Sequence, residues 1–124
     1  MKEVINSPQA PGAIGPYSQA IEAGGMVFVS GQLPIDAATG QMVEGVEAQT
    51  RQSLTNMQFI LGQAGLTMDN VVKTTVYLKD MSAFAEMNKV YSTFFTNNYP
   101  ARSAFAVREL PKDALVEIEC IAVR

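Results

Sequence analysis

The sequence of 124 residues contains no histidine and a single cysteine, Cys120. Without histidine, neither a Ser–His–Asp triad nor a Cys–His pair can form, and further copies of the same chain cannot supply one. Histidine-built zinc or iron sites are excluded for the same reason, and one cysteine per chain is too few for a Cys₄ metal site. Catalysis by this chain would therefore have to use carboxylates, arginine, lysine, tyrosine, serine, backbone groups and water.

Charge and long apolar runs are also scarce. Charged residues make up 17% of the chain, the net charge is −3, and the lysines and arginines form no basic run. Nucleic-acid binding through neutralised phosphates is therefore disfavoured. No apolar run approaches the roughly 20 residues of a membrane span, and residues 1–5 lack the apolar core of a signal peptide. With one cysteine and hence no internal disulfide, these features predict a cytoplasmic protein without membrane or nucleic-acid partners.

Hydrophobic residues, by contrast, make up 48% of the sequence. A chain of this length suits a single domain over residues 1–124, and such a domain buries only about two thirds of its unfolded surface. The apolar content is high for a small soluble protein. We therefore expect other copies of the chain to cover part of the apolar surface.

The spacing of apolar residues predicts two helices and six strands. The helices are expected over residues 46–64, with Gly65 as the C-terminal cap, and over residues 82–97, with Asp80 or Ser82 as the N-terminal cap. The strands are expected at Val4 and over residues 17–23, 26–35, 70–80, 103–107 and 115–123. The order βββαβαββ predicts an α+β fold, with both helices on one face of a mixed sheet and the other face covered by another subunit.

Arg102 lies in the stretch "NNYPARSAFAVREL", among small and apolar neighbours just before a predicted strand. A long charged side chain seldom sits in such company without a partner. Its planar guanidinium is suited to bidentate binding of a carboxylate or phosphate. The alternative is a structural arginine that pairs with a carboxylate of the protein or caps a helix.

The predicted last strand, "ALVEIECIAV", carries two glutamates among apolar residues. Alternation places Glu117 and Glu119 on one face and Cys120 on the other. A buried carboxylate needs a partner, water or a raised pKa, and a raised pKa suits acid–base catalysis. Alternation cannot choose between the two glutamates, and a salt bridge at the rim or interface is the alternative for each. Cys120 is expected to be a buried, inert thiol.

Three further residues are weaker candidates. Ser30 and Gly31 end a predicted strand in "VSGQLP", where glycine would let the backbone approach a ligand closely; a plain bulge or turn is the favoured explanation. Tyr17 follows a Gly-Pro turn in "AIGPYSQA" and could donate its hydroxyl, or it is simply a packed aromatic.

Taken together, these stretches resemble the RidA/YjgF family of reactive intermediate deaminases over nearly the whole chain. The likeness includes "APGAIGPYSQA", "VSGQLPID", "QTRQSLTNMQFILGQAGLTMDNVVKTTVYLKDM" and "FAEMNKVYSTFF". It ends in "PARSAFAVRELPKDALVEIECIAV", which matches the family signature.

The resemblance implies a chorismate-mutase-like α+β fold. It also implies a homotrimer with a central β-barrel, outer helices and ligand clefts between subunits. The implied activity is the hydrolysis of 2-imino acids and their enamine tautomers, such as 2-iminobutanoate and 2-iminopropanoate, to 2-keto acids and ammonia, without a cofactor or metal. A trimer that only binds a keto acid or another small carboxylate, as a regulator, is the alternative.

By the same resemblance, Arg102 holds the substrate carboxylate and Glu117 handles the water. Tyr17, Ser30, Gly31 and Asn88 match further positions of the cleft. Many members of the family have cysteine at the position of Ala104. The backbone N–H at Ala104 remains available for ligand binding, but regulation through a thiol at that position is impossible.

Overall fold

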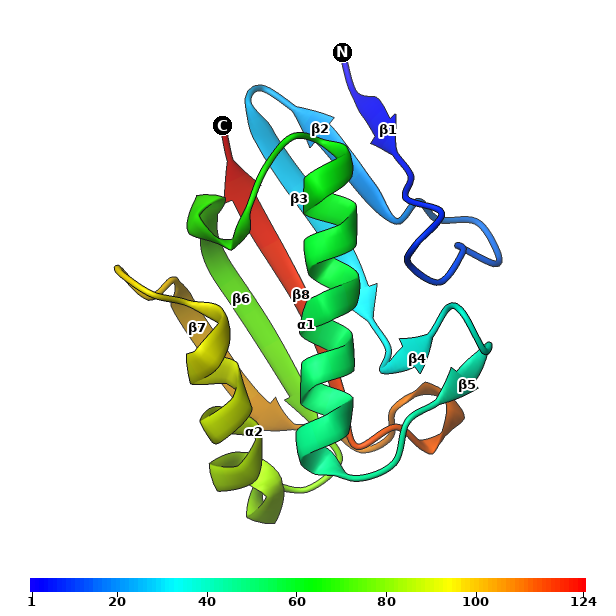
Figure 1. Ribbon diagram of the computed structural model, residues 1–124, viewed down its shortest axis with the longest axis vertical. Coiled ribbons are helices and arrows are strands. Elements are labelled where there is room, and N and C mark those ends of the chain that lie inside the picture. The colour runs from blue at the N-terminus through cyan, green and yellow to red at the C-terminus, as the bar shows by residue number, and fades with distance from the viewer.

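The computed structural model describes all 124 residues and contains one six-stranded sheet covered by two helices (Figure 1). Its strands follow the order β1-β2-β3-β8-β6-β7. All neighbours are antiparallel except β6 and β7, which are parallel. The strands are β1 (Glu3–Ile5), β2 (Ala20–Ala23), β3 (Met26–Gln32), β6 (Val71–Leu78), β7 (Ala101–Ala106) and β8 (Val116–Val123). The predicted α+β fold, with its mixed sheet and two helices, is confirmed.

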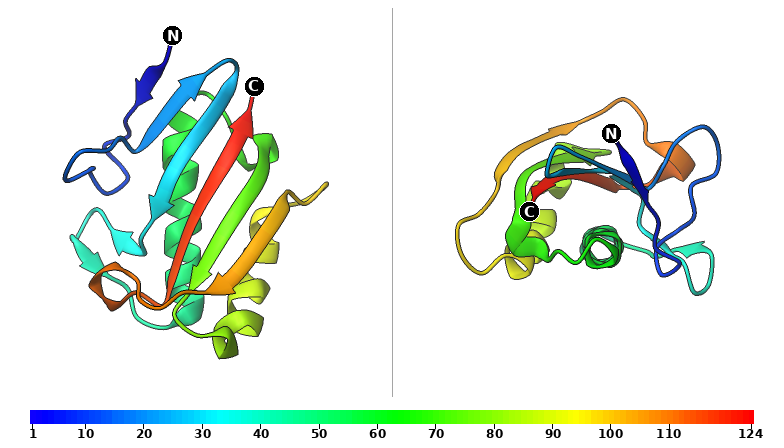
Figure 2. Two further views of the ribbon diagram at one scale, coloured as in Figure 1. Left: turned by 180° about the vertical axis from the view of Figure 1, so that it is seen from behind. Right: turned by 90° about the horizontal axis from the view of Figure 1, so that it is seen from above.

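Helices α1 (Val46–Gln63) and α2 (Phe84–Tyr91) both lie on one face of the sheet, as Figure 2 shows from above. On α1, Leu54, Met57 and Leu61 recur at helical spacing and are fully buried, as a helix with one apolar face requires. The helix ends as expected, because Gly65 has a φ of 76° and the Leu66 N–H donates to the Leu61 carbonyl.

The structure differs from the predicted elements in several places. Helix α2 has only 8 residues, because short 3₁₀ turns at Met81–Ala83 and Ser92–Phe94 flank it and the last three residues of the predicted range are not helical. Asp80 caps the first of these turns by accepting a hydrogen bond from the Ser82 N–H. A small separate hairpin, β4 (Ile35–Asp36) with β5 (Gln41–Met42), was not predicted at all.

The predicted strand over residues 17–23 begins only at Ala20. The buried Gln19 side chain explains the late start. Its amide donates to the carbonyls of Ser7 and Pro11 and accepts from the Ser7 N–H, so the preceding loop folds back on itself instead of pairing with a strand.

The face of the sheet away from the helices carries apolar side chains without cover. Phe28 is 42% exposed and Phe105 44% exposed, and both lie on this face. Residues that point toward the helices from β8, such as Ile118 and Cys120, are buried. The sequence-based expectation of one covered and one uncovered face is therefore confirmed. None of the helices is both long enough and apolar enough to cross a membrane.

Candidate functional site

Arg102 lies on edge strand β7 and points to the face of the sheet that carries the helices. Its partner across the strands is Thr74, which in turn lies opposite the buried Cys120. The Arg102 Nη1 donates to the Asn88 Oδ1 at 2.7 Å. The guanidinium carbon lies 4.7 Å from the ring centre of Tyr91 and 5.3 Å from that of Phe84, distances typical of cation–π contacts.

These three neighbours come from one helix. Phe84, Asn88 and Tyr91 follow each other at helical spacing on α2, so all three reach the same side chain on β7. The ion pairs of the structure are Lys79–Asp113, Lys89–Glu47 and Arg124–Glu22, and none involves Arg102. Pairing with a carboxylate of the same chain, one of the alternatives for Arg102, is therefore absent.

A hollow of about 440 Å³ opens beside the guanidinium of Arg102 and is large enough for a small organic acid. Its lining consists of Asn88, Tyr91, Ser92, Tyr99, Pro100 and Arg102. Arg102 makes a single side-chain hydrogen bond, to Asn88, and so keeps further N–H donors free. The part of the candidate site around Arg102 is therefore suited to binding an anion.

Glu117 lies on the other face of the sheet. It stands opposite Tyr77, which lies opposite the exposed Phe105. The carboxylate is half-buried, and burial raises its pKa above the ordinary range, with a further contribution from the negative charge of Glu119. Glu117 is thus a carboxyl group suited to taking and returning protons.

The backbone of Gly31 packs directly against this carboxylate. A Cβ at position 31 would lie 2.9 Å from the Glu117 Cδ and 3.0 Å from its Oε2. Ser30 and Gly31 of β3 together lie opposite the single residue Glu119 of β8. This extra residue makes a β-bulge in β3. The bulge was one of the two explanations considered from the sequence. Here it also brings Gly31 next to Glu117.

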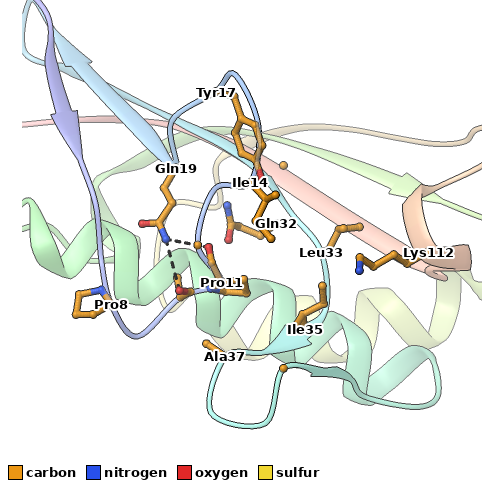
Figure 3. Close-up of a pocket in the computed structure, with 14 residues that line it drawn as sticks. Pro8, Pro11, Ile14, Tyr17, Gln19, Gln32, Leu33, Ile35, Ala37 and Lys112 are labelled. Carbon is orange, nitrogen blue, oxygen red and sulfur yellow. Dashed lines mark hydrogen bonds between the residues drawn. The ribbon is translucent and has the colours of Figure 1, made fainter.

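Tyr17 and Ser30 lie close to this second half. The Ser30 hydroxyl donates to the Ser18 carbonyl at 2.6 Å, which fixes the loop that carries Tyr17. A hollow of about 630 Å³ has Tyr17, Gly31 and Gln32 in its lining (Figure 3). Figure 3 also shows Leu33, Ile35 and Lys112 around the same space, and the Gln19 hydrogen bonds that hold its loop wall.

The predicted site residues therefore form two groups within one chain. Arg102, Asn88 and Ala104 belong to the face that carries the helices, whereas Glu117, Gly31, Ser30 and Tyr17 gather at the other face and the adjoining loop. The sheet separates Arg102 from Glu117, and the contacts with α2 hold the arginine on its own side. A single chain does not bring the two groups to one small molecule.

Sequence reasoning missed the aromatic neighbours of Arg102. The predicted helix over residues 82–97 contains Phe84 and Tyr91, but neither they nor Thr74 were considered as neighbours of Arg102. The signal was present, because the same spacing places Asn88 on the face of Phe84 and Tyr91. Cys120 is buried as expected, and burial raises the pKa of its thiol to about 12, so it is no nucleophile at neutral pH.

The raised pKa of Glu117 predicts a stability that depends on pH. Because the pKa of Glu117 is raised in the folded state, the folded protein binds a proton there more tightly than the unfolded chain does. Glu117 therefore stabilises the fold while it is protonated, and this contribution to the free energy of unfolding is lost as the pH rises above the ordinary carboxyl range. In urea titrations at pH 7, Glu117→Gln should unfold at a higher urea concentration than the wild type, and the difference should shrink toward pH 4. A lower midpoint for the variant at pH 7 would contradict this account.

Comparisons with known proteins were consistent over the full chain. A family model described as Endoribonuclease L-PSP matches residues 7–124. A RutC family protein of Pyrococcus horikoshii is 54% identical, over 100% of this chain and 99% of its own length. A 2-iminobutanoate/2-iminopropanoate deaminase of Salmonella typhimurium is 50% identical, also over 100% of this chain and 99% of its own length.

Among solved structures, a protein of unknown function from Yersinia pestis, of the conserved Rid protein family, is similar throughout. It shares 48% identity and a TM-score of 0.98, and the match covers 100% of both chains. The resemblance seen in the sequence is confirmed. Because the family model spans nearly the whole chain and these relatives match it over their full length, the chain belongs to the endoribonuclease L-PSP family, which takes in the Rid (RidA/YjgF) proteins.

Proposed function

We propose that this protein hydrolyses reactive 2-imino acids, and their enamine tautomers, to 2-keto acids and ammonia. The substrates would be 2-iminobutanoate and 2-iminopropanoate, and their removal would protect other enzymes from damage. The observation that carries the proposal is Arg102, a clamped cation with free donors beside a hollow and no carboxylate partner. The name of the Salmonella relative supports the same activity.

The complete site would form between two copies of the chain. Arg102 and Glu117 lie on opposite faces of the sheet, so one copy would provide Arg102 with Asn88 and Ala104, and the next would provide Glu117 with Gly31, Ser30 and Tyr17. The uncovered apolar face offers the surface for such assembly. A homotrimer with a central β-barrel, which the family resemblance implies, would be a closed ring of three copies with three equivalent clefts.

In this cleft, Arg102 would form two charge-assisted hydrogen bonds to the substrate carboxylate. That contact places the imine carbon beside a water held by Glu117. A protonated imine is already a good electrophile, so the water can add without a metal or a cofactor. Glu117 takes a proton from the attacking water, which gives a carbinolamine, and returns that proton to the nitrogen. The C–N bond then breaks as the hydroxyl oxygen forms the keto C=O bond, the hydroxyl proton passes to Glu117, and ammonia leaves.

The raised pKa of Glu117 fits this double role, because an ordinary carboxylate is a weaker base near neutral pH. The hydroxyls of Tyr17 and Ser30, and the backbone at Gly31 and Ala104, would orient the substrate. Ala104 contributes through its backbone, since its side chain has no polar group.

A coupled assay tests the proposal. A threonine dehydratase generates 2-aminocrotonate and 2-iminobutanoate in the cuvette, and semicarbazide traps the imine that escapes hydrolysis. The wild-type protein should suppress semicarbazone formation and raise the yield of 2-oxobutanoate. Normal semicarbazone formation, together with tight 2-oxobutanoate binding, would instead favour the regulatory carboxylate binder.

The description of the family model names RNA cleavage instead. The chain has a net charge of −3 and no histidine to serve as acid or base. We therefore expect no RNA cleavage in gel assays at low salt. RNA binding that weakens steeply with added salt would revive that function.

The close packing at Gly31 gives a further prediction for this activity. Gly31→Ala should push the Glu117 carboxylate away, because the new Cβ would lie 2.9 Å from its Cδ. The side chain can move, so the protein should still fold. Displacement of the base by about 1 Å is expected to lower kcat by roughly a hundredfold.

Gly62→Ala is the matched control for that variant. Gly62 lies in α1, and no atom would lie within 4 Å of an added Cβ. This change should leave kcat unaltered and raise the free energy of unfolding by about 0.5–1 kcal/mol. Equal kcat values for the two variants would remove Gly31 from the site.

A further inference from the structure

Tyr91 contacts two different parts of the structure. Its ring lies against the Arg102 guanidinium, with 4.7 Å between the guanidinium carbon and the ring centre. Its hydroxyl forms a buried hydrogen bond of 2.8 Å with Thr74 Oγ1 on β6. Thr74 is fully buried, and Tyr91 is only 4% exposed. One side chain thus connects the inner strand β6 to the candidate anion-binding arginine on edge strand β7.

The hydroxyl pair fixes the plane of the Tyr91 ring. A ring held only by apolar packing can tilt, whereas a hydrogen bond at its far end ties it to β6. Thr74 is also the residue opposite Arg102 in the ladder of β6 and β7, so the bond anchors the ring next to the strand that carries the arginine. The ring that packs against the guanidinium is thus held at both ends.

Phe84 and Asn88 complete the enclosure of the guanidinium. The ring centre of Phe84 lies 5.3 Å from the guanidinium carbon, and the Asn88 Oδ1 accepts a hydrogen bond from Nη1 of Arg102. Two aromatic contacts and one hydrogen bond restrain the group, while its remaining donors stay available beside the hollow. A guanidinium restrained in this way loses little conformational entropy when it binds a carboxylate.

We propose that Tyr91 and Thr74 form a positioning pair that sets the direction of Arg102 for binding a planar carboxylate. This proposal rests on the proposed function for its substrate, but not for the restraint itself. Arg102 touches the ligand. Tyr91 also lines the hollow, but its hydroxyl is bonded to the buried Thr74 and acts only through Arg102, so loss of this hydroxyl pair should weaken carboxylate binding without slowing the chemical step.

The experiment compares Tyr91→Phe, Thr74→Val and the double variant. Each single change leaves one buried hydroxyl unpaired and should lower the free energy of unfolding, whereas the double change removes both hydroxyls and should recover much of that loss. The dissociation constant for 2-oxobutanoate, measured by calorimetry, should rise roughly three- to tenfold in all three variants. KM should rise with it, and kcat should stay within about twofold.

The double variant separates positioning from general packing. If Tyr91 and Thr74 only support the core, 2-oxobutanoate affinity will recover together with stability, and the proposal fails. Ile60→Val is the control for core damage, since Ile60 is fully buried on α1. It should lower the urea concentration at which the protein unfolds and leave 2-oxobutanoate affinity unchanged.

A measurement on the arginine itself needs no ligand. In the full-length wild type, ¹⁵N relaxation of the Arg102 Nε–H group should report a restrained side chain, and in Tyr91→Phe and the double variant a more mobile one. If the mobility of Arg102 were unchanged in these variants, the positioning role proposed for Tyr91 and Thr74 would be wrong. If the wild type neither hydrolyses imines nor binds 2-oxobutanoate, the proposed function fails, and this relaxation measurement alone decides the positioning pair.

Discussion

Glu117→Gln is expected to lower kcat for imine hydrolysis by roughly a hundred- to ten-thousandfold, the usual contribution of a general acid–base group. Glutamine keeps the shape of the side chain but cannot accept a proton from water. Binding of 2-oxobutanoate should persist, because Arg102 supplies that contact. The measurement is kcat from the coupled assay, set beside the calorimetric dissociation constant for 2-oxobutanoate.

Glu119→Gln is the matched control, because Glu119 lies two positions along β8 on the same face. Its negative charge helps to raise the pKa of Glu117. This control should keep most of its turnover and move the acidic limb of the pH profile to lower pH. If Glu117→Gln lost binding while each bound substrate still turned over normally, Glu117 would be a positioning residue and not the base.

Arg102→Ala is expected to lower kcat/KM by roughly ten- to a hundredfold from lost charged hydrogen bonds, and by more if the substrate is misplaced. Arg102→Lys should recover little of the lost kcat/KM. A lysine ammonium lacks the planar guanidinium that Asn88 and the rings of Phe84 and Tyr91 hold in place. Arg108→Ala, an exposed arginine shortly after β7, serves as the control. Near-normal kcat/KM in a folded Arg102→Ala assembly would refute the assigned role.

A mixing experiment tests whether each cleft takes its two halves from different copies. Arg102→Ala and Glu117→Gln proteins are unfolded, combined in equal amounts and refolded together. In a randomly mixed closed ring, about a quarter of the clefts would hold a native arginine from one copy and a native glutamate from the next. Activity should return to about that fraction of wild type. If both residues came from one chain, no cleft would be complete and no activity would return.

Much of the fold was predictable because its signals are local. The stripe of Leu54, Met57 and Leu61 and the cap at Gly65 are set by residues within a few turns of each other. The alternation in β8 gave the buried and open faces correctly. The prediction for residues 17–19 was wrong because the Gln19 side chain bonds to residues about ten positions away, which no local pattern reports.

The candidate site was predictable only in part, and for a related reason. Sequence chemistry alone singled out Arg102 and could not separate Glu117 from Glu119. The structure distinguishes them through Gly31, a contact between residues far apart in the chain. The contacts of Arg102 with α2 depend on the parallel pairing of β6 and β7, which brings Thr74 and Arg102 together. In the proposed cleft, the roles of these residues depend on surfaces contributed by two copies of the chain.

The connection from β6 through α2 to β7 has a consequence for how such proteins diverge. The arginine half of the site, with Thr74, Asn88, Tyr91 and Arg102, lies within residues 71–106. The glutamate half is built from chain on either side of that segment. In the proposed function, mutations that accumulate in residues 71–106 would therefore alter acid binding, while the water handling proposed for Glu117 is inherited unchanged. We expect paralogues that differ in substrate preference to differ mainly in this one segment.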